Sequence, residues 1–208
     1  MNHLFQKGAD PAAPTLVLLH GTGGNERDLV PLARAIAPDS SYLGLRGNVL
    51  ENGMPRFFRR LAEGVFDEED LLFRTDEVRR FLDEAAVRYE LDRSNLVAVG
   101  YSNGANLAGS LLFHHERVLR GAILHHPMVP RRGVTLPDLT GTPVFIGAGT
   151  NDPICSPGET EELGNLLRGT GAEVDVHWES YGHQLTASEA EAAAVWFRSR
   201  FGSRTPGE

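Results

Sequence analysis

Short apolar runs recur along the chain, and segments with helical spacing separate them. The runs at residues 15–19, 96–99, 121–124 and 143–148 contain almost no polar side chains. Continuous apolar runs of this length are typical of strands that a parallel sheet buries on both faces. Two further strands are predicted at residues 41–45 and 173–178. The runs therefore predict a mostly parallel sheet with a buried centre.

Between these runs, apolar residues recur at the spacing of one helix face. Helices are predicted after a cap at Asp28, over residues 70–89, from 102 to about 114, over 157–167 and over 188–201. Strands that alternate with helices in this way imply right-handed crossovers and helices on both faces of the sheet. The expected fold class is therefore α/β, with one domain over residues 1–202 and a flexible tail at 203–208.

The connection between residues 46 and 69 shows no clean period, although it contains Met54, Phe57, Phe58 and Phe66. A connection of this length in a compact domain is usually functional or disordered, and we interpret this one as functional. Adjacent residues of an extended chain point in opposite directions, so Phe57 and Phe58 are expected to divide between a pocket wall and an anchor to the sheet. The alternative is that the phenylalanines only hold this connection against the sheet.

The size and the charge of the chain limit its partners. The 208 residues are 41% hydrophobic and carry 28 acidic against 20 basic side chains, a formal charge of −8. No Lys and Arg cluster is dense enough for a phosphate-binding surface, so we expect no nucleic acid and no anionic membrane as a partner. The first ten residues contain no apolar signal region, and Cys155 is the single cysteine. A cytoplasmic protein without membrane insertion or an internal disulfide is therefore predicted.

One strand and one helix meet at a glycine-flanked serine, in the segment Gly100-Tyr-Ser-Asn-Gly104. This G-x-S-x-G pattern lies between an apolar run and a helical stretch of small residues, the context that a nucleophile elbow requires. The glycines allow a turn sharp enough to lift the serine hydroxyl away from the backbone. Ser102 is therefore the candidate nucleophile, because a serine hydroxyl needs an adjacent base to be activated.

Ligands of open parallel sheets bind beyond the carboxyl ends of the strands, so the residues that follow each strand are candidates for chemistry. An acid and a histidine occur at two further strand ends, as Asp152 and His183. With Ser102 they follow the chain order Ser, Asp, His of one class of triad. Taken alone, Asp152 is equally well interpreted as a turn former before Pro153. His183, taken alone, could be a histidine of a surface loop. Together the three predict a catalytic triad.

Four other residues near strand ends have two interpretations each. His20 is interpreted as a structural loop residue rather than a catalytic one. His125 and His126 are expected to pack or to line the pocket, with proton transfer as the alternative. Cys155 is interpreted as a small buried hydrophobic residue rather than a reactive thiol.

Four motifs stand at the ends of predicted strands: His20-Gly-Thr-Gly-Gly24, Gly100-Tyr-Ser-Asn-Gly104, Gly149-Thr-Asn-Asp152 and Gly182-His183. Together they resemble the carboxylesterase/phospholipase branch of the α/β-hydrolases, which includes bacterial carboxylesterases and acyl-protein thioesterases. The resemblance spans nearly the whole chain, and the segment from Arg46 to Asp67 is similar to that of the small bacterial carboxylesterases. It implies carboxylesterase activity and an α/β-hydrolase fold that has no lid domain. It is also consistent with a homodimer. Asn103 stands where acyl-protein thioesterases have glutamine. This difference argues against a protein-depalmitoylating role.

Placed around one ester carbonyl, these groups predict acyl transfer on a small-molecule ester. His183 is expected to accept the proton of Ser102, and Asp152 to hold the imidazole in the correct tautomer. The backbone amides of Thr22 and Asn103 are the expected oxyanion hole. The expected substrate pocket is formed by Phe57, Phe58, Phe66 and Ile154. A short pocket wall favours small to medium acyl chains.

Other functions are weighed against this one. The loop at residues 21–24 lacks the third glycine of a dinucleotide fingerprint, because Glu26 occupies that position, so no cofactor is expected. The acidic residues 67–70 are interpreted as the capped first turn of a helix, so no metal is expected. A thioesterase or lysophospholipase acting on longer acyl chains is an alternative. A non-catalytic ligand-binding protein of the same fold is another.

Overall fold

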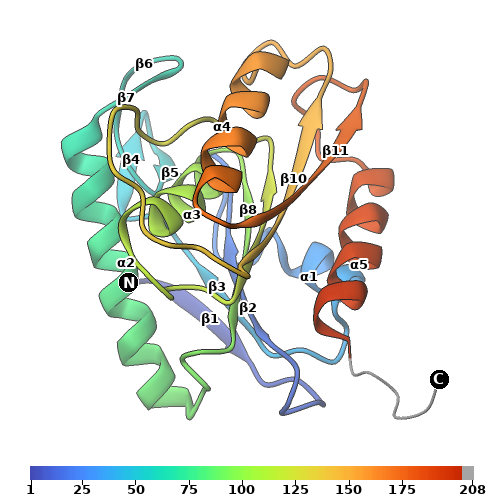
Figure 1. The fold of residues 1–208 in the computed structure, drawn as a ribbon. Coiled ribbons are helices and arrows are strands. Elements are labelled where there is room, and N and C mark those ends of the chain that lie inside the picture. The colour runs from blue at the N-terminus through green and yellow to red at the C-terminus, as the bar shows by residue number, and fades with distance from the viewer. Residues whose placement is uncertain (203–208) are drawn as a thin grey trace.

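A seven-stranded sheet with helices on both faces forms the fold of the computed structural model, which describes residues 1–202 (Figure 1). The predicted flexible tail at 203–208 lies outside the described residues. The strands of this sheet are β1 (His3–Gln6), β2 (Thr15–Leu19), β3 (Tyr42–Leu45), β8 (Leu96–Tyr101), β9 (Gly121–His125), β10 (Pro143–Gly149) and β11 (Glu173–Glu179). The helices are α1 (Val30–Ile36), α2 (Glu68–Tyr89), α3 (Asn103–His114), α4 (Pro157–Gly169) and α5 (Ala187–Phe201).

The strand order across the sheet is β1-β3-β2-β8-β9-β10-β11. Every neighbouring pair is parallel except β1 with β3, which is antiparallel. The mostly parallel sheet predicted from the apolar runs is confirmed. β1 was not predicted, because a four-residue edge strand that is only partly buried gives neither a continuous apolar run nor a long alternation.

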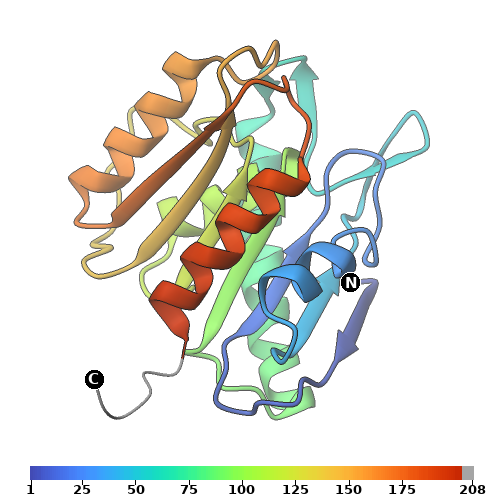
Figure 2. The same ribbon diagram turned by 90° about the vertical axis from the view of Figure 1, so that its right-hand side faces the viewer.

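The central strands are buried on both faces because helices cover each face (Figure 2). Val17 and Leu19 of β2 belong to the core beneath α2, α3 and α4, whereas Leu16 and Leu18 belong to the core beneath α1 and α5. Successive side chains of a strand point to opposite faces, so both sets must be apolar. This explains why the strands read as continuous apolar runs.

The helix starts differ in how they are capped. At α2 the side chain of Asp67 accepts the backbone N–H of Asp70, which confirms that the acidic segment is a capped first turn. At α1 the predicted cap is wrong. Asp28 lies in the preceding turn and accepts the backbone N–H and the side-chain amide of Asn25, and the helix begins after Leu29 without a side-chain cap. Within residues 1–202, no helix combines the length and the apolar composition needed to cross a membrane.

The connection between β3 and α2 is more regular than its sequence indicates. It forms two antiparallel hairpins, β4 (Val49–Glu51) with β5 (Met54–Arg56), and β6 (Arg60–Ala62) with β7 (Val65–Phe66). Strands of two or three residues are too short to show a period, so the hairpins could not be predicted from the hydrophobic pattern.

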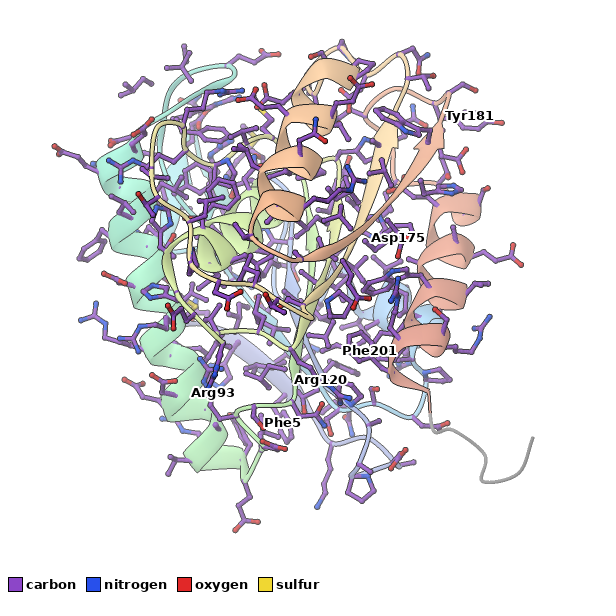
Figure 3. The ribbon with its side chains drawn as sticks, in the orientation of Figure 1. Phe5, Arg93, Arg120, Asp175, Tyr181 and Phe201 are labelled. Atoms are coloured by element: carbon purple, nitrogen blue, oxygen red, sulfur yellow. The ribbon has the colours of Figure 1, made fainter. Side chains whose placement is uncertain are left out.

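Helix α5 is fixed to the sheet at its C-terminal end. The indole N–H of Trp196 donates to the Asp175 carboxylate on β11 at 2.8 Å, and Arg200 pairs with the same carboxylate. Phe201 packs on Trp196, and the Arg120 guanidinium carbon lies 5.1 Å from the Phe201 ring centroid (Figure 3). These contacts hold the helix across β10 and β11, so its N-terminal turn has a defined place beside the strand ends.

Candidate active site

Ser102 lies on a strained turn between β8 and α3. Its φ of 51° and ψ of −113° fall outside the regions that non-glycine residues commonly occupy. A Cβ at Gly104 would overlap the carbonyl oxygen of Leu19, and a Cβ at Gly100 would approach the Cα of Ala105 to 2.7 Å. Both glycines of the motif are therefore required by the close approach of strand and helix. The Ser102 backbone N–H donates to the His125 carbonyl oxygen at 2.9 Å, which ties the turn to β9.

The structure brings the serine, the histidine and the acid together at three strand ends. Oγ of Ser102 is 2.8 Å from Nε2 of His183. Nδ1 of His183 is 2.7 Å from Oδ2 of Asp152. Because Nδ1–H donates to Asp152, Nε2 carries the lone pair. The serine hydroxyl therefore donates a hydrogen bond to Nε2 of His183. This is the geometry that general-base activation of a nucleophile needs.

The carboxylate of Asp152 is held from several sides. Its Oδ1 accepts the backbone N–H groups of Ile154 at 2.8 Å and of Cys155 at 2.9 Å. Burial alone would raise the pKa of Asp152, but these two amides and the hydrogen bond from His183 bring it below its ordinary value. Asp152 therefore remains ionised although it is only 6% exposed.

Two residues that the sequence did not single out fix the loop that carries His183. The hydroxyl of Tyr101 donates to the His183 carbonyl oxygen at 2.7 Å. Oδ1 of Asn151 accepts the N–H of Gly182 at 2.8 Å, and Gly182 has a φ of +64°. Tyr181, just before this turn, points outward at the end of β11 (Figure 3). Tyr101 lies in the serine motif, and Asn151 lies beside Asp152. Only this closeness to predicted catalytic residues could have indicated from the sequence that they support the site.

The backbone amides of Thr22 and Asn103 flank the serine. Neither N–H donates to another group within residues 1–202, and Asn103 is the first residue of α3, where the helix dipole favours negative charge. Their side chains are held elsewhere, because Thr22 Oγ1 accepts from Arg56 and Asn103 Oδ1 accepts the N–H of Phe57, both at 2.7 Å. The two amides are thus free for a ligand oxygen.

A cavity of about 300 Å³ opens beside Ser102. Phe66 and Ile154, two of the residues expected in the substrate pocket, line it together with Met128. The prediction that Phe57 or Phe58 forms part of the wall is wrong. Neither lines this cavity, and both are in the core, at 2% and 0% exposure. The reason is that the hairpins on either side turn this short segment inward, so both rings anchor it.

Two arginines give the cavity a charged wall that the sequence analysis missed. Arg56 is buried at 4% exposure, and Arg60 lies beside it. Both pair with Glu51, Arg56 at 3.3 Å and Arg60 at 2.7 Å. The pairing joins the two hairpins and leaves two guanidinium groups facing one carboxylate. Arginines in a loop without a period resemble ordinary surface residues, so only the fold reveals that they line the cavity beside Ser102.

His125 and His126 are both fully buried and do not line the cavity. They contact Glu189, in the first turn of α5, and His126 also contacts Asp152. Glu189 follows its cap Thr186 at the spacing of a capping box, so its sequence position indicates a helix cap rather than a buried ion pair. His126, Asp152 and His183 are also close enough to bind a metal together. Their ligand atoms hydrogen-bond one another directly, with the carboxylate of Asp152 between the two imidazole rings.

The other two residues with open interpretations are structural. His20 donates from Nδ1 to the Gly21 carbonyl oxygen at 2.6 Å and accepts the Gly47 N–H at Nε2, at 3.1 Å. Burial lowers the pKa of His20, which keeps this bridging ring neutral. Burial also raises the pKa of the Cys155 thiol, so Cys155 is a small buried residue and not a nucleophile.

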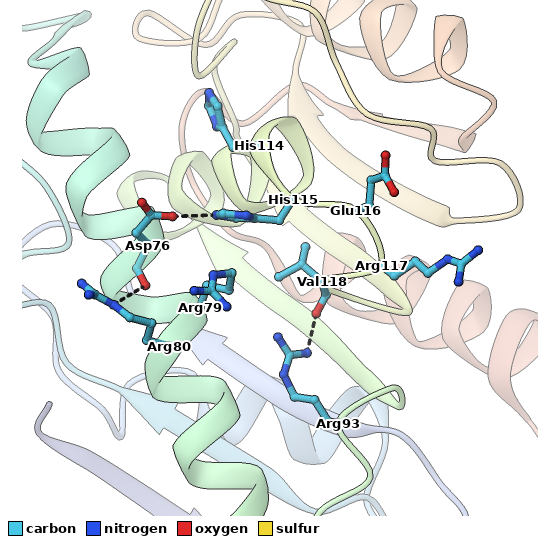
Figure 4. A pocket seen from close by; sticks show the side chains of 9 residues that line it. All are labelled: Asp76, Arg79, Arg80, Arg93, His114, His115, Glu116, Arg117 and Val118. Atoms are coloured by element: carbon cyan, nitrogen blue, oxygen red, sulfur yellow. Dashed lines mark hydrogen bonds and ion pairs between the residues drawn. The ribbon is translucent and has the colours of Figure 1, made fainter.

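A second cavity, of about 500 Å³, lies between α2 and the segment after α3 (Figure 4). Its lining is rich in arginine and histidine, but most of these groups are paired. Arg93 donates to the Val118 carbonyl oxygen, Arg79 pairs with Asp83, and His115 pairs with Asp76. None of the predicted site residues lines it. The strand-end cavity is therefore the candidate active site.

The fold and the groups at its strand ends define an enzyme of the α/β-hydrolase class. Over residues 4–198 the chain matches the dienelactone hydrolase family, and it belongs to that family. The predicted membership of the α/β-hydrolases is confirmed.

Several proteins of known sequence or structure are similar to this chain. MhqD of Bacillus subtilis (strain 168), whose name assigns it to the hydrolases, is 59% identical over 198 residues, 95% of this chain and 98% of MhqD. The crystal structure of the Bacillus cereus carboxylesterase has 64% identity and a TM-score of 0.96, and the match covers 97% of this chain and 95% of that one. YahD, solved with malic acid, has 31% identity and a TM-score of 0.91 over 96% of this chain and 98% of its own.

Stability at low pH provides a test of the buried carboxylates. Asp152 and Glu189 have folded-state pKa values below their ordinary values of 3.8 and 4.5. Their contribution to stability is therefore complete above about pH 4.5 and is lost as the pH falls through the folded-state values. We expect the urea midpoint, followed by circular dichroism, to drop between pH 5 and pH 3. Glu189→Gln should make this drop smaller, and Glu68→Gln, which neutralises an exposed carboxylate, should not. Equal drops in both variants would contradict the assignment.

Proposed function

We propose that this chain is a serine hydrolase that cleaves carboxylic esters of small to medium acyl chain through an acyl-enzyme intermediate. The observation that carries the proposal is the continuous hydrogen-bonded path from Ser102 Oγ through His183 to Asp152. Similarity to the carboxylesterase of Bacillus cereus over nearly the whole chain supports an ester as the substrate.

The first half of the reaction forms the acyl-enzyme. His183 removes the hydroxyl proton as Ser102 Oγ attacks the ester carbonyl carbon, and Asp152 stabilises the imidazolium that results. Collapse of the tetrahedral intermediate breaks the bond to the alcohol oxygen, which takes the proton from His183 Nε2. The alcohol leaves, and the acyl group stays on Ser102.

The second half repeats the same proton transfers with water. Water takes the place of the alcohol, gives a proton to His183 and attacks the acyl carbonyl, and Ser102 Oγ leaves with the proton returned by His183. In both halves negative charge develops on the carbonyl oxygen. We expect the N–H groups of Thr22 and Asn103, which donate to no other group within residues 1–202, to receive it, and preorganised donors of this kind commonly contribute about 10²- to 10³-fold to the rate.

The proposed acyl size follows from the cavity. A volume of about 300 Å³ is at the lower end of the range for small-molecule sites. The apolar part of its wall is made by Phe66, Met128 and Ile154, and the remainder is largely polar. A long alkyl chain would have to leave this short apolar wall, so short and medium acyl groups fit best.

Ser102→Ala is expected to lower kcat/KM for p-nitrophenyl acetate by on the order of 10⁴-fold, because the attacking oxygen is removed. Labelling by a fluorophosphonate probe should be stoichiometric in the parent protein and absent in the variant. Ser199→Ala, which changes an exposed serine of α5, serves as the control and should keep both properties. Persistent labelling of Ser102→Ala would refute the proposed nucleophile, and a parent protein without turnover would favour a ligand-binding role.

Phe66→Ala is expected to shift the preference towards longer acyl chains, because it removes the aromatic part of the cavity wall. The measurement is kcat/KM for a series of p-nitrophenyl esters and matching thioesters. Phe73→Ala is the control, since Phe73 lies on α2, is 54% exposed and does not line the cavity. If both variants keep the parent's chain-length profile, Phe66 does not limit acyl size.

A further inference from the structure

His126 is enclosed by acceptor oxygens. Its Nδ1 lies 3.0 Å from Oδ2 of Asp152. Its Nε2 lies 3.1 Å from Oε2 of Glu189 and 3.1 Å from the carbonyl oxygen of Gln184. The ring is fully buried, so water does not compete for either nitrogen. A neutral imidazole donates through one nitrogen only. Here both ring nitrogens face acceptor oxygens, so the doubly protonated ring satisfies every contact.

The shared proton belongs on the imidazole. The ordinary pKa of histidine is about two units above that of glutamic acid, so a proton between them favours the ring. Burial lowers the pKa of His126, but the hydrogen bonds and charges of Glu189 and Asp152 outweigh burial and raise it. Burial would raise the pKa of Glu189, but the hydrogen bonds and charges of His125 and His126 lower it. His126 is thus a cation between two carboxylates.

The fold makes room for this ion pair. Glu189 is fully buried, and its Oε1 accepts from Nδ1 of His125. A Cβ at Gly147 of β10 would overlap that oxygen, so only glycine leaves space for the carboxylate there. His126 itself has a φ of 54°, in the left-handed region, and its backbone N–H donates to the Gly147 carbonyl oxygen at 2.7 Å. The strained backbone directs its ring between the two acids.

We propose that His126 and Glu189 are positioning residues of the hydrolase: a buried cation and its counterion that fix Asp152, the carboxylate that holds His183. The inference rests on the proposed function of Ser102, His183 and Asp152. Neither residue lines the cavity, so both act through Asp152 rather than on the substrate. The hydrogen bond from His126 reaches Oδ2 of Asp152, the same oxygen that holds His183.

The electrostatic effect on His183 has a definite sign. The ring centroids of His126 and His183 are 5.1 Å apart. A cation at this distance disfavours a second cation, and it also shares the negative charge of Asp152. Removing the cation should therefore favour positive charge on His183, and the pH profile of the activity measures that effect.

The groups around His126 come from several elements. They are Tyr101 on β8, His125 on β9, Asp152 and Cys155 after β10, His183 after β11 and Glu189 on α5. The thiol of Cys155 donates to the His126 carbonyl oxygen at 3.2 Å, and burial raises the pKa of both Cys155 and Tyr101, so these two remain neutral. The cation thus faces two carboxylates and no other anion among these groups.

The double variant His126→Asn with Glu189→Gln removes the cation and its counterion together. Asparagine is chosen because it tolerates the left-handed backbone better than most residues. The expected result is a rise of about one pH unit or more in the midpoint of the acidic limb of kcat/KM for p-nitrophenyl acetate, with KM little changed. Glu159→Gln is the matched control, since Glu159 holds the equivalent position after the cap of α4. An unshifted acidic limb in the double variant would overturn the proposal.

Stability measures the pairing independently of activity. His126→Asn alone removes one of the two imidazoles that pair with the buried Glu189, so its urea midpoint should fall further than that of the double variant. A single variant as stable as the double variant would contradict the ion pair. The conservative change Glu189→Asp should keep part of the parent's pH profile.

Nitrogen-15 NMR of the unmodified protein decides the charge even if the variants do not fold. As the pH rises, both ring nitrogens of His126 should stay protonated beyond the range in which an unperturbed histidine loses its proton. Loss of the second proton within that ordinary range would overturn the proposal. Because this readout needs no turnover, failure of the positioning role and failure of the proposed hydrolase function are distinguishable.

Discussion

The close packing of β8, α3 and β2 around Ser102 is the constraint on which the site depends. Gly100 and Gly104 let strand and helix approach until no side chain fits between them, and the turn that joins them forces Ser102 to a φ of 51°. The same turn frees the Asn103 amide at the start of α3. One steric condition therefore provides both the exposed serine hydroxyl and the unpaired amide that the proposed mechanism needs.

The charges behind the serine follow from the parallel sheet. Strands β9 and β10 end, and helix α5 begins, at the same edge of the sheet. This brings Asp152, His126 and Glu189 into contact away from water. Buried charges persist only when paired and hydrogen-bonded, and each of these three groups has at least two partners. The edge thus holds a row of alternating acids and bases that begins at Ser102.

Much of this arrangement could be predicted from the sequence. The buried strands read as apolar runs because both faces are covered, and Ser102, Asp152 and His183 stand directly after strands. Pairing partners could not be predicted. Glu189 resembles a helix cap, and only the crossing of α5 over β10 shows that its carboxylate turns inward. Phe57 and Phe58 were misplaced for a related reason, since the two short hairpins that turn them into the core have no detectable period.

The most direct test of the central claim is to trap the acyl-enzyme. The protein is mixed with excess p-nitrophenyl acetate, quenched in acid within the first turnovers and digested for mass spectrometry. An ester intermediate predicts one acetyl group on the peptide that contains Ser102, together with a burst of p-nitrophenol of similar stoichiometry. Turnover with the acetyl group on another residue, or with no adduct and no burst at saturating ester, would contradict the account.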